Sequence, residues 1–284
     1  PVGADRDRVM IRRLKLALPL FLFAAACGET KPQPHIILVV VDTLRADALG
    51  CYGHAAAHTP AIDAFAAESV QFADAVSSSG WTLPSVGSLL TGVWPSLHKA
   101  TGKVSLLRPI SPDIPTAAEL LVDEGYRTLG FANAAYLSPL LGLDRGFEVF
   151  DHEHAYNQDV RRADQTVSDA IAVLNQGDEG APIFLLAHLF DSHLDYDPLP
   201  EDLARATVGL SGPAPPLSLR GCKALAQEDK PPSEELQTWV RAVYDAEVAA
   251  IDRAFARLRA ALEERGIWDD AIVILTSDHG EEFW

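Results

Sequence analysis

The chain lacks several features that would assign it to a particular class of protein. Only three of its 284 residues are cysteines, too few for the disulfide framework of a small secreted domain. No run of five or more basic residues occurs, and the formal net charge is -17. A surface this acidic repels nucleic acid and anionic lipid, so we expect no nucleic-acid partner. The sequence also contains no internal repeat and no low-complexity tract.

A hydrophobic run long enough to span a bilayer is missing as well. The segment LALPLFLFAAAC at residues 16–27 is too short for this and contains a proline. It follows basic residues and ends in small residues before a cysteine, which is typical of an export signal. We therefore expect residues 1–27 to hold upstream residues and a lipoprotein-type signal peptide, with Cys27 as the acylated residue. The alternative is cleavage nearby, with Cys27 incidental.

This signal predicts an exported protein, periplasmic or in the cell envelope, whose only link to the membrane is a lipid anchor. Residues 28–34, GETKPQP, are polar and contain prolines, so we interpret them as a tether. Residues 35–284 have the length and apolar content of one large α/β domain. The sequence stops directly after a strand-like segment, so we expect that the C-terminal part of this domain is missing.

Apolar strands alternate with amphipathic helices along this region. Continuous apolar or β-branched runs, typical of strands buried on both faces, occur at residues 35–41, 126–133, 182–190 and 271–277. One helix is predicted to begin at Pro60 with Thr59 as its N-cap, and others to cover residues 115–125, 159–177 and 233–266. The alternation predicts a mostly parallel central sheet with helices on both faces. Residues 195–232 are proline-rich and weakly periodic, which predicts an irregular excursion.

Side chains that can bind a metal follow three of the predicted strands. Asp42 ends the first strand, Asp191 and His193 follow the third, and Asp278-His279 follow the last. In an open parallel sheet, ligands bind outside the carboxyl ends of the strands. Each residue alone could be a loop aspartate or a helix cap, but the three positions together favour a site. A carboxylate beside an imidazole suits a divalent cation with mixed oxygen and nitrogen ligands.

The segment GWTLPSVGSLLTG, residues 80–92, predicts the start of a helix with Thr82 as N-cap and Pro84 close behind. A helix N-terminus presents free N–H groups and a partial positive charge, which favour an anion. Thr82 is therefore placed where a phosphate or sulfate would dock, and a metal could activate its hydroxyl as a nucleophile. The alternative is a cap without a chemical role.

Together these segments resemble the sulfatase family, within the alkaline phosphatase superfamily. The motifs that carry the resemblance follow the family's order and include VVVDTLRADALGCYG, WTLPSVGSLLTG, HLFDSHLDYDP and TSDHGEEFW. The resemblance implies an alkaline phosphatase/sulfatase-like fold and one divalent metal ion (Zn, Mn, Mg or Ca), held by Asp42, Asp278 and His279. It places Thr82 at the nucleophile position. It also implies a substrate that is a sulfate or phosphate ester, either a small molecule or carried by a glycan or lipid.

Further roles follow from the same resemblance. His193 matches the histidine of the family's Asp-x-His motif, which contacts the transferred group or helps the leaving group. The same motif begins with Asp191, which we assign to substrate binding. His98 matches a position near the active site, and Lys103 is expected nearby, so both are further candidates for substrate binding.

The sequence departs from the family pattern at the nucleophile. Sulfatases oxidise a cysteine or serine to formylglycine, whereas oxidation of Thr82 would give a ketone. Val86 replaces the motif's arginine, and Thr43 stands where many members have a second aspartate. The set of Asp, Thr, Asp and His resembles the threonine-dependent phosphoryl-transfer members of the superfamily. We expect a metal-dependent hydrolase of sulfate or phosphate esters. The alternatives are a phosphoryl-group transferase to a lipid or glycan alcohol, or a non-catalytic envelope binding protein.

Overall fold

The computed structural model describes residues 33–103, 106–152, 161–176, 180–211 and 232–283. The predicted signal peptide with Cys27 and most of the tether lie outside the described residues. Within the described ranges, no helix is both long enough and apolar enough to cross a membrane.

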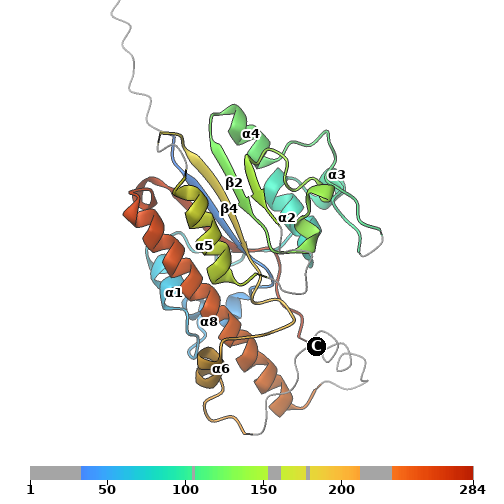
Figure 1. The fold of residues 1–284 in the computed structure, drawn as a ribbon. Coiled ribbons are helices and arrows are strands. Elements are labelled where there is room, and N and C mark those ends of the chain that lie inside the picture. The colour runs from blue at the N-terminus through green and yellow to red at the C-terminus, as the bar shows by residue number, and fades with distance from the viewer. Residues whose placement is uncertain (1–32, 104–105, 153–160, 177–179, 212–231, 284) are drawn as a thin grey trace, which may run out of the picture. The chain divides into compact units, whose positions relative to one another are not determined.

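Five parallel strands form one sheet in the order β3-β2-β4-β1-β5 (Figure 1). Their bounds are Ile36–Val41 for β1, Arg127–Phe131 for β2, Val149–Asp151 for β3, Ile183–Leu189 for β4 and Ile272–Ser277 for β5. The four strands predicted from apolar runs are confirmed. The short edge strand β3 was not predicted, because it has no apolar run of its own. The central strands β1 and β4 are buried almost throughout, which explains their continuous apolar sequences.

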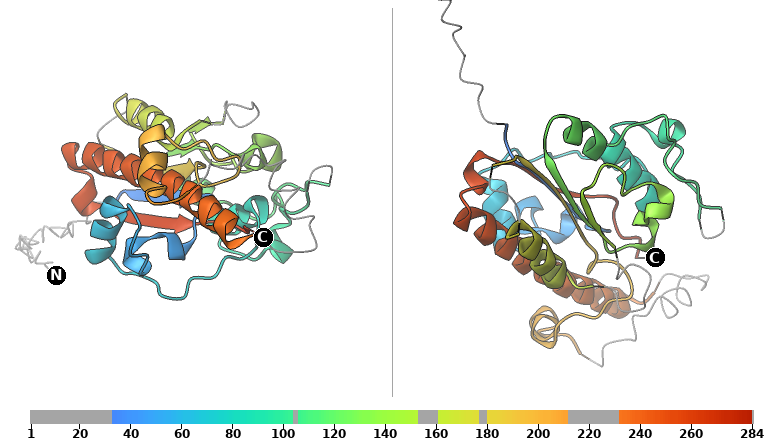
Figure 2. Two further views of the ribbon diagram at one scale, coloured as in Figure 1. Left: turned by 90° about the horizontal axis from the view of Figure 1, so that it is seen from below. Right: turned by 45° about the horizontal axis from the view of Figure 1, so that its top comes forward.

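Helices cover both faces of the sheet, as predicted (Figures 1 and 2). One face packs against α5 and α8, and α1 lies against α8. The other face packs against α2 and α4. The bounds of these helices are Pro60–Ala67 for α1, Thr82–Thr91 for α2, Ala117–Asp123 for α4, Ala163–Leu174 for α5 and Glu234–Glu264 for α8. This layering confirms the predicted fold class and leaves the carboxyl edge of the sheet as the place where strand ends and helix N-termini meet.

Shorter helices fill the connections. The α-helices α3 and α6 cover Pro95–His98 and Pro200–Ala206, and the 3₁₀ turns cover Ala46–Ala48, Gly50–Tyr52, Ala135–Leu137, Pro139–Leu141 and Trp268–Asp270. Helix α6 lies inside the region predicted to be irregular, so that prediction was wrong for its first part. A proline at its first position fixes a helical φ and removes an N–H that would have no partner there. The rest of the predicted excursion, residues 212–231, lies outside the described residues.

Two helix starts differ from the expectation in how they are capped. Helix α2 begins at Thr82 itself, and Trp81 is the N-cap, so the prediction that Thr82 is the cap was wrong. Helix α1 begins at Pro60 as predicted, but the side chain of Thr59 does not cap it. The carboxylate of Asp252 in α8 accepts hydrogen bonds from two backbone N–H groups in the first turn of α1 instead. A residue distant in sequence thus supplies the acceptor that the N-terminus needs.

Candidate active site

The carboxyl edge of the sheet gathers three buried metal-binding side chains from β1, β4 and β5. Val40 in β1 is the register partner of His188 in β4, and Asp42 lies two residues after Val40, directly beyond the end of β1. Because side chains alternate along a strand, Asp42 and His188 project to the same face as Val40, which is the face covered by α2. Asp278 directly follows β5. All three side chains are 0% exposed, and one ligand atom of each lies within 4.8 Å of those of the others.

Several polar atoms in this cluster have no hydrogen-bond partner. They are Oδ1 of Asp42, Oδ2 of Asp278 and both ring nitrogens of His188. A buried polar atom left unpaired costs about 1–3 kcal/mol, so a cluster of four such atoms in a native fold calls for a partner. Two carboxylates and an imidazole form the kind of donor set that a divalent cation binds. The residues therefore fit the metal ion implied by the sequence.

The pKa values of the two carboxyl groups are shifted in opposite directions. Burial and the negative charge of Asp42 raise the pKa of Asp278 to about 6. Burial also acts to raise the pKa of Asp42, but the approach of His188, with His193 and His279 nearby, holds that pKa below its usual value. Two negative charges in one buried site repel each other, and a bound cation would relieve this repulsion.

Thr82 lies directly against this cluster. Its hydroxyl donates a hydrogen bond of 3.2 Å to Oδ2 of Asp42, and its Oγ1 is 3.4 Å from Nε2 of His279. The predicted nucleophile and the predicted metal ligands are therefore brought together. Ser85, one turn further into α2, donates to the backbone carbonyl of Asp278 and ties the helix to the end of β5. Val86, at the position of the family's motif arginine, is 1% exposed and belongs to the apolar core beneath α2.

The turn after Asp42 is strained and held in place by long-range hydrogen bonds. Thr43 has a φ of 57°, which a β-branched residue rarely adopts. Its N–H donates to Asp278, its hydroxyl donates to the carbonyl of Ser192, and its carbonyl accepts from the hydroxyl of Tyr244. Strain of this kind costs on the order of 1–3 kcal/mol and persists only where the surroundings over-determine it. These bonds fix the positions of both carboxylates relative to each other.

His279 and His193 lie at the more open side of the cluster. Nε2 of His279 is 3.7 Å from Oδ1 of Asp42 and 3.5 Å from Oδ2 of Asp278, the two unpaired carboxylate oxygens. The ring of His193 stacks on Phe190 with a centroid distance of 4.4 Å, and its Nδ1 bonds the carbonyl of Leu194. A carbonyl only accepts, so Nδ1 carries the proton of that bond and Nε2 remains for chemistry.

The three residues expected to bind substrate have different surroundings. Lys103 is exposed, and its ammonium group lies 5.4 Å from the ring centroid of Trp81, the residue before Thr82. His98 is fully buried: its Nδ1 accepts from the N–H of Ala100, and its Nε2 lies 3.1 Å from the hydroxyl of Ser88. Burial lowers the pKa of His98, and a ring nitrogen that accepts a hydrogen bond carries no proton, so the geometry fits a neutral imidazole.

Asp191 has a structural partner too. One carboxylate oxygen accepts a hydrogen bond of 2.8 Å from the N–H of Ala163, the first residue of α5. Burial raises the pKa of Asp191 to about 6. The described contacts of Asp191 and His98 thus account for both residues without a substrate, and their assignment to substrate binding finds no support in this geometry.

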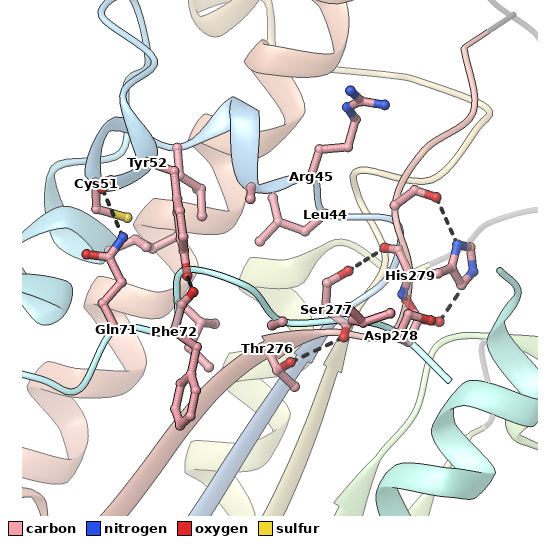
Figure 3. A pocket seen from close by; sticks show the side chains of 18 of the residues that line it. Leu44, Arg45, Cys51, Tyr52, Gln71, Phe72, Thr276, Ser277, Asp278 and His279 are labelled. Carbon is pink, nitrogen blue, oxygen red and sulfur yellow. Dashed lines mark hydrogen bonds and ion pairs between the residues drawn. The ribbon is translucent and has the colours of Figure 1, made fainter. Parts of the chain in front are cut away.

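A cavity of about 750 Å³ opens beside the cluster (Figure 3). Asp278 and His279 line one end of it, and Cys51, Tyr52 and Phe72 line the other. Asp42, Thr82 and His188 do not line this cavity. Its lining also includes Ser85 of α2, so the cavity borders the cluster along the end of β5 and the first turn of α2.

His188 is the residue of the cluster that the sequence analysis missed. It lies inside β4 rather than after it, so a search of strand ends passes over it. Its signal was a lone histidine in the apolar run IFLLAHL, at a position that faces the same side as two core residues of the strand.

The model of the sulfatase family matches residues 34–283. The chain belongs to the sulfatase family. It is 26% identical to an ulvan-active sulfatase of Formosa agariphila over 88% of this chain and 51% of that protein. Among solved structures, a protein in complex with its substrate D-glucosamine-2-N,6-O-disulfate superposes with a TM-score of 0.68 at 20% identity. That match covers 87% of this chain and 66% of the other.

A phosphonate monoester hydrolase of Agrobacterium radiobacter shares the fold as well, with a TM-score of 0.64 and 21% identity over 88% of this chain and 63% of the other. The chain spans about half the length of the ulvan-active sulfatase that it matches. These matches establish the fold and the family of the chain.

Proposed function

We propose that this protein is a metal-dependent hydrolase of sulfate or phosphate esters that uses Thr82 as its nucleophile. The observation that carries the proposal is the contact of the Thr82 hydroxyl with Asp42 and His279, at a cluster with four unpaired metal-binding atoms. The family supports the hydrolysis of esters, and its relatives include sulfatases and a phosphonate monoester hydrolase. The family favours sulfate esters, whereas threonine in place of cysteine or serine favours phosphate esters. The proposal therefore includes both ester classes.

Asp42, Asp278 and His279 would hold the metal ion. A divalent cation bound there lowers the pKa of a nearby hydroxyl and polarises an ester oxygen. The carboxylate of Asp42 holds Thr82 Oγ1 in place and accepts its proton, because Oδ2 already receives that hydrogen bond at 3.2 Å. The free N–H groups in the first turn of α2 face the anion, and Pro84 removes one of them at no cost to the helix.

The reaction then proceeds in two displacements. Oγ1 of Thr82 forms a bond to phosphorus or sulfur, the ester bond to the leaving oxygen breaks, and protonated His193 gives that oxygen a proton from Nε2. In the second step water forms a bond to the same centre and the bond to Thr82 breaks. His193 takes the proton of the water, and Thr82 regains its own from Asp42. Both residues end as they began.

The test is a panel of an aryl phosphate monoester, an aryl phosphate diester and an aryl sulfate, offered to the wild-type protein and to Thr82→Ala. We expect the substitution to lower kcat by about 10³-fold or more, since a nucleophile is removed. Thr82→Ser is the matched control, because it keeps the hydroxyl and loses only the methyl group, and it should retain activity within about tenfold. Equal turnover by the wild type and Thr82→Ala would overturn the assignment of the nucleophile.

We also propose that the protein is exported and anchored in the cell envelope through a lipid on Cys27. The basic start, the short apolar run and the small residues before Cys27 support this location. Cys27→Ser should abolish the incorporation of a labelled fatty acid into the protein, because the acylated thiol is removed. Labelling of that variant at the wild-type level would argue against the anchor.

A further inference from the structure

We propose that His188 binds the metal ion directly, as an imidazole ligand supplied from within β4, and that the site therefore selects a transition metal ion. The proposal rests on the proposed function, because it adds a ligand to that site and narrows the choice of ion. His188 lies near the carboxyl end of β4, the middle strand of the sheet, and is fully buried beside Asp42.

The hydrogen bonds of His188 are the first observation. Neither ring nitrogen has a partner, although a buried imidazole carries one donor and one acceptor, or two donors when protonated. His98, the other fully buried histidine among the described residues, has a partner at each nitrogen. The protein thus supplies hydrogen-bond partners for both nitrogens of one buried imidazole, His98, and for neither nitrogen of His188. This difference points to a ligand of His188 from outside the protein.

A purely orienting role for His188 accounts for less of the geometry. Its Nε2 lies 3.4 Å from Oδ2 of Asp42, and this oxygen already accepts the hydrogen bond of Thr82. If His188 only oriented Asp42, this one contact would be all that holds its buried ring, and neither ring nitrogen would have a hydrogen-bond partner. One cation bound by Asp42, His188 and Asp278 provides a partner for all three side chains at once, and their ligand atoms are within 4.8 Å of one another.

The donor set then decides the class of ion. His188 and His279 supply nitrogen, and Asp42 and Asp278 supply oxygen. Calcium and magnesium are bound almost entirely by oxygen, whereas Zn²⁺ and related transition metal ions bind imidazole and carboxylate together. With two imidazoles at one centre, we infer that Zn²⁺ or a similar transition metal ion binds more tightly than Mg²⁺ or Ca²⁺.

X-ray absorption of the purified, Zn²⁺-loaded protein tests the ligand assignment, because imidazole rings give a countable scattering signature. We expect two imidazoles in the wild type, one in His188→Ala and one in His279→Ala. His58→Ala is the control, since His58 is exposed and outside the cluster, and it should keep two. The same imidazole count in His188→Ala as in the wild type would overturn the proposal. If His188→Ala does not fold, His279→Ala decides: one remaining imidazole supports His188, and none refutes it.

Equilibrium titration with Zn²⁺, Mg²⁺ and Ca²⁺ tests the choice of ion. Zn²⁺ should bind at least 100-fold more tightly than Mg²⁺ to the wild type, and His188→Ala should lose most of this preference. Equal affinity for the two ions would refute the inference even if the protein hydrolyses esters. Conversely, two imidazoles on Zn²⁺ with no turnover of any ester would refute the proposed function and leave the ligand assignment standing.

Discussion

Two groups of buried carboxylates in this molecule differ in what their oxygens contact. At the carboxyl edge of the sheet, Asp42 and Asp278 each have one oxygen without a hydrogen-bond partner. On helix α8, both oxygens of Asp252 accept backbone N–H groups from α1, and Glu247 accepts the N–H of Asp197 in the segment after β4. Both groups are nearly inaccessible to water.

The difference indicates two uses of a buried acid. On α8 the protein itself supplies the donors, so each carboxylate joins two segments that are far apart in the sequence. At the sheet edge the described residues leave one oxygen of each carboxylate without a donor, and we expect a bound cation to supply the missing partner. Buried carboxylates are costly unless they are paired or bind a metal ion, so we expect the stability of the sheet-edge pair to depend on an ion and that of the α8 pair not to.

The largest effect is expected for metal affinity when Asp42 is replaced. Asp42→Asn removes a charged ligand at the centre of the cluster, and we expect the affinity for Zn²⁺ to fall by about 10³-fold. Structural zinc sites gain roughly 10–16 kcal/mol from about four ligands, so one ligand accounts for about 2.5–4 kcal/mol, and the upper end of this range corresponds to about 10³-fold. Isothermal titration measures this loss. The control is Asp252→Asn, the same change at a carboxylate whose two oxygens both accept hydrogen bonds. It should bind Zn²⁺ with the affinity of the wild type. An equal loss of Zn²⁺ affinity in the two variants would show that the sheet-edge carboxylates and the α8 carboxylates do not differ in metal binding.

The next effect concerns pH and the stability of the α8 group. Burial and the charge of Asp191 raise the pKa of Glu247 to about 8, against an ordinary value near 4.5. Because the folded protein keeps this proton to a higher pH than the unfolded chain does, Glu247 makes the folded state less stable as the pH rises from about 4.5 to 8. Each pKa unit is worth 1.36 kcal/mol, so the loss over this range is on the order of 4 kcal/mol.

Glu247→Gln should remove that loss, because glutamine keeps the acceptor for the N–H of Asp197 and does not titrate. Urea unfolding of the wild type and the variant from pH 5 to pH 8 measures the difference. We expect the two stabilities to be similar at pH 5 and the variant to be the more stable protein at pH 8. Parallel pH profiles for the two proteins would contradict the assignment of a raised pKa to Glu247.

The third prediction is that a substitution in the candidate site, Asp278→Asn, stabilises the metal-free protein instead of destabilising it. Asp278→Asn removes one of two like charges from a buried, metal-free site, so the variant should be more stable than the wild type by about 1–3 kcal/mol in the presence of a chelator. Addition of Zn²⁺ should stabilise the wild type more than the variant, since the carboxylate is then a ligand. Thermal unfolding with and without the ion measures both effects. Lower stability of the chelated variant would mean that Asp278 is not strained by its neighbour.

The site was predictable where its residues follow strands. In a parallel sheet the carboxyl ends meet at one edge, so Asp42, Asp278 and His279 could be placed together from their positions after apolar runs. Thr82 could be placed at a helix start and joined to them through the family motifs. His188 could not be found by the same reasoning, because it lies within β4 and its role depends on strand register and side-chain alternation.

Other features depend on contacts that no local pattern contains. The strained turn at Thr43 is held by Tyr244, which is 201 residues away in the sequence. The cap of α1 is supplied by Asp252, about 190 residues away, so a search for a local cap stops at Thr59. Asp191 matched a family motif and yet bonds the start of α5, since a motif fixes a position in the chain and not the direction of a side chain.

The smallest change in stability is expected for a substitution of Asp252, and its sign should be opposite to that for Asp278. Asp252 accepts 2.8 Å and 3.2 Å hydrogen bonds from the N–H groups of Ile62 and Ala61, one with each oxygen. Asn at this position has one carbonyl oxygen, so its amide group would face one of those donors, and the N-terminus of α1 would lose an acceptor. Loss of a helix N-terminal acceptor costs about 1 kcal/mol. Chelated Asp252→Asn should therefore be less stable than the wild type, while chelated Asp278→Asn is more stable. If both substitutions change the stability in the same direction, hydrogen bonding does not distinguish the two groups of buried acids. The stability data would then give no support to a metal site at the carboxyl edge of the sheet.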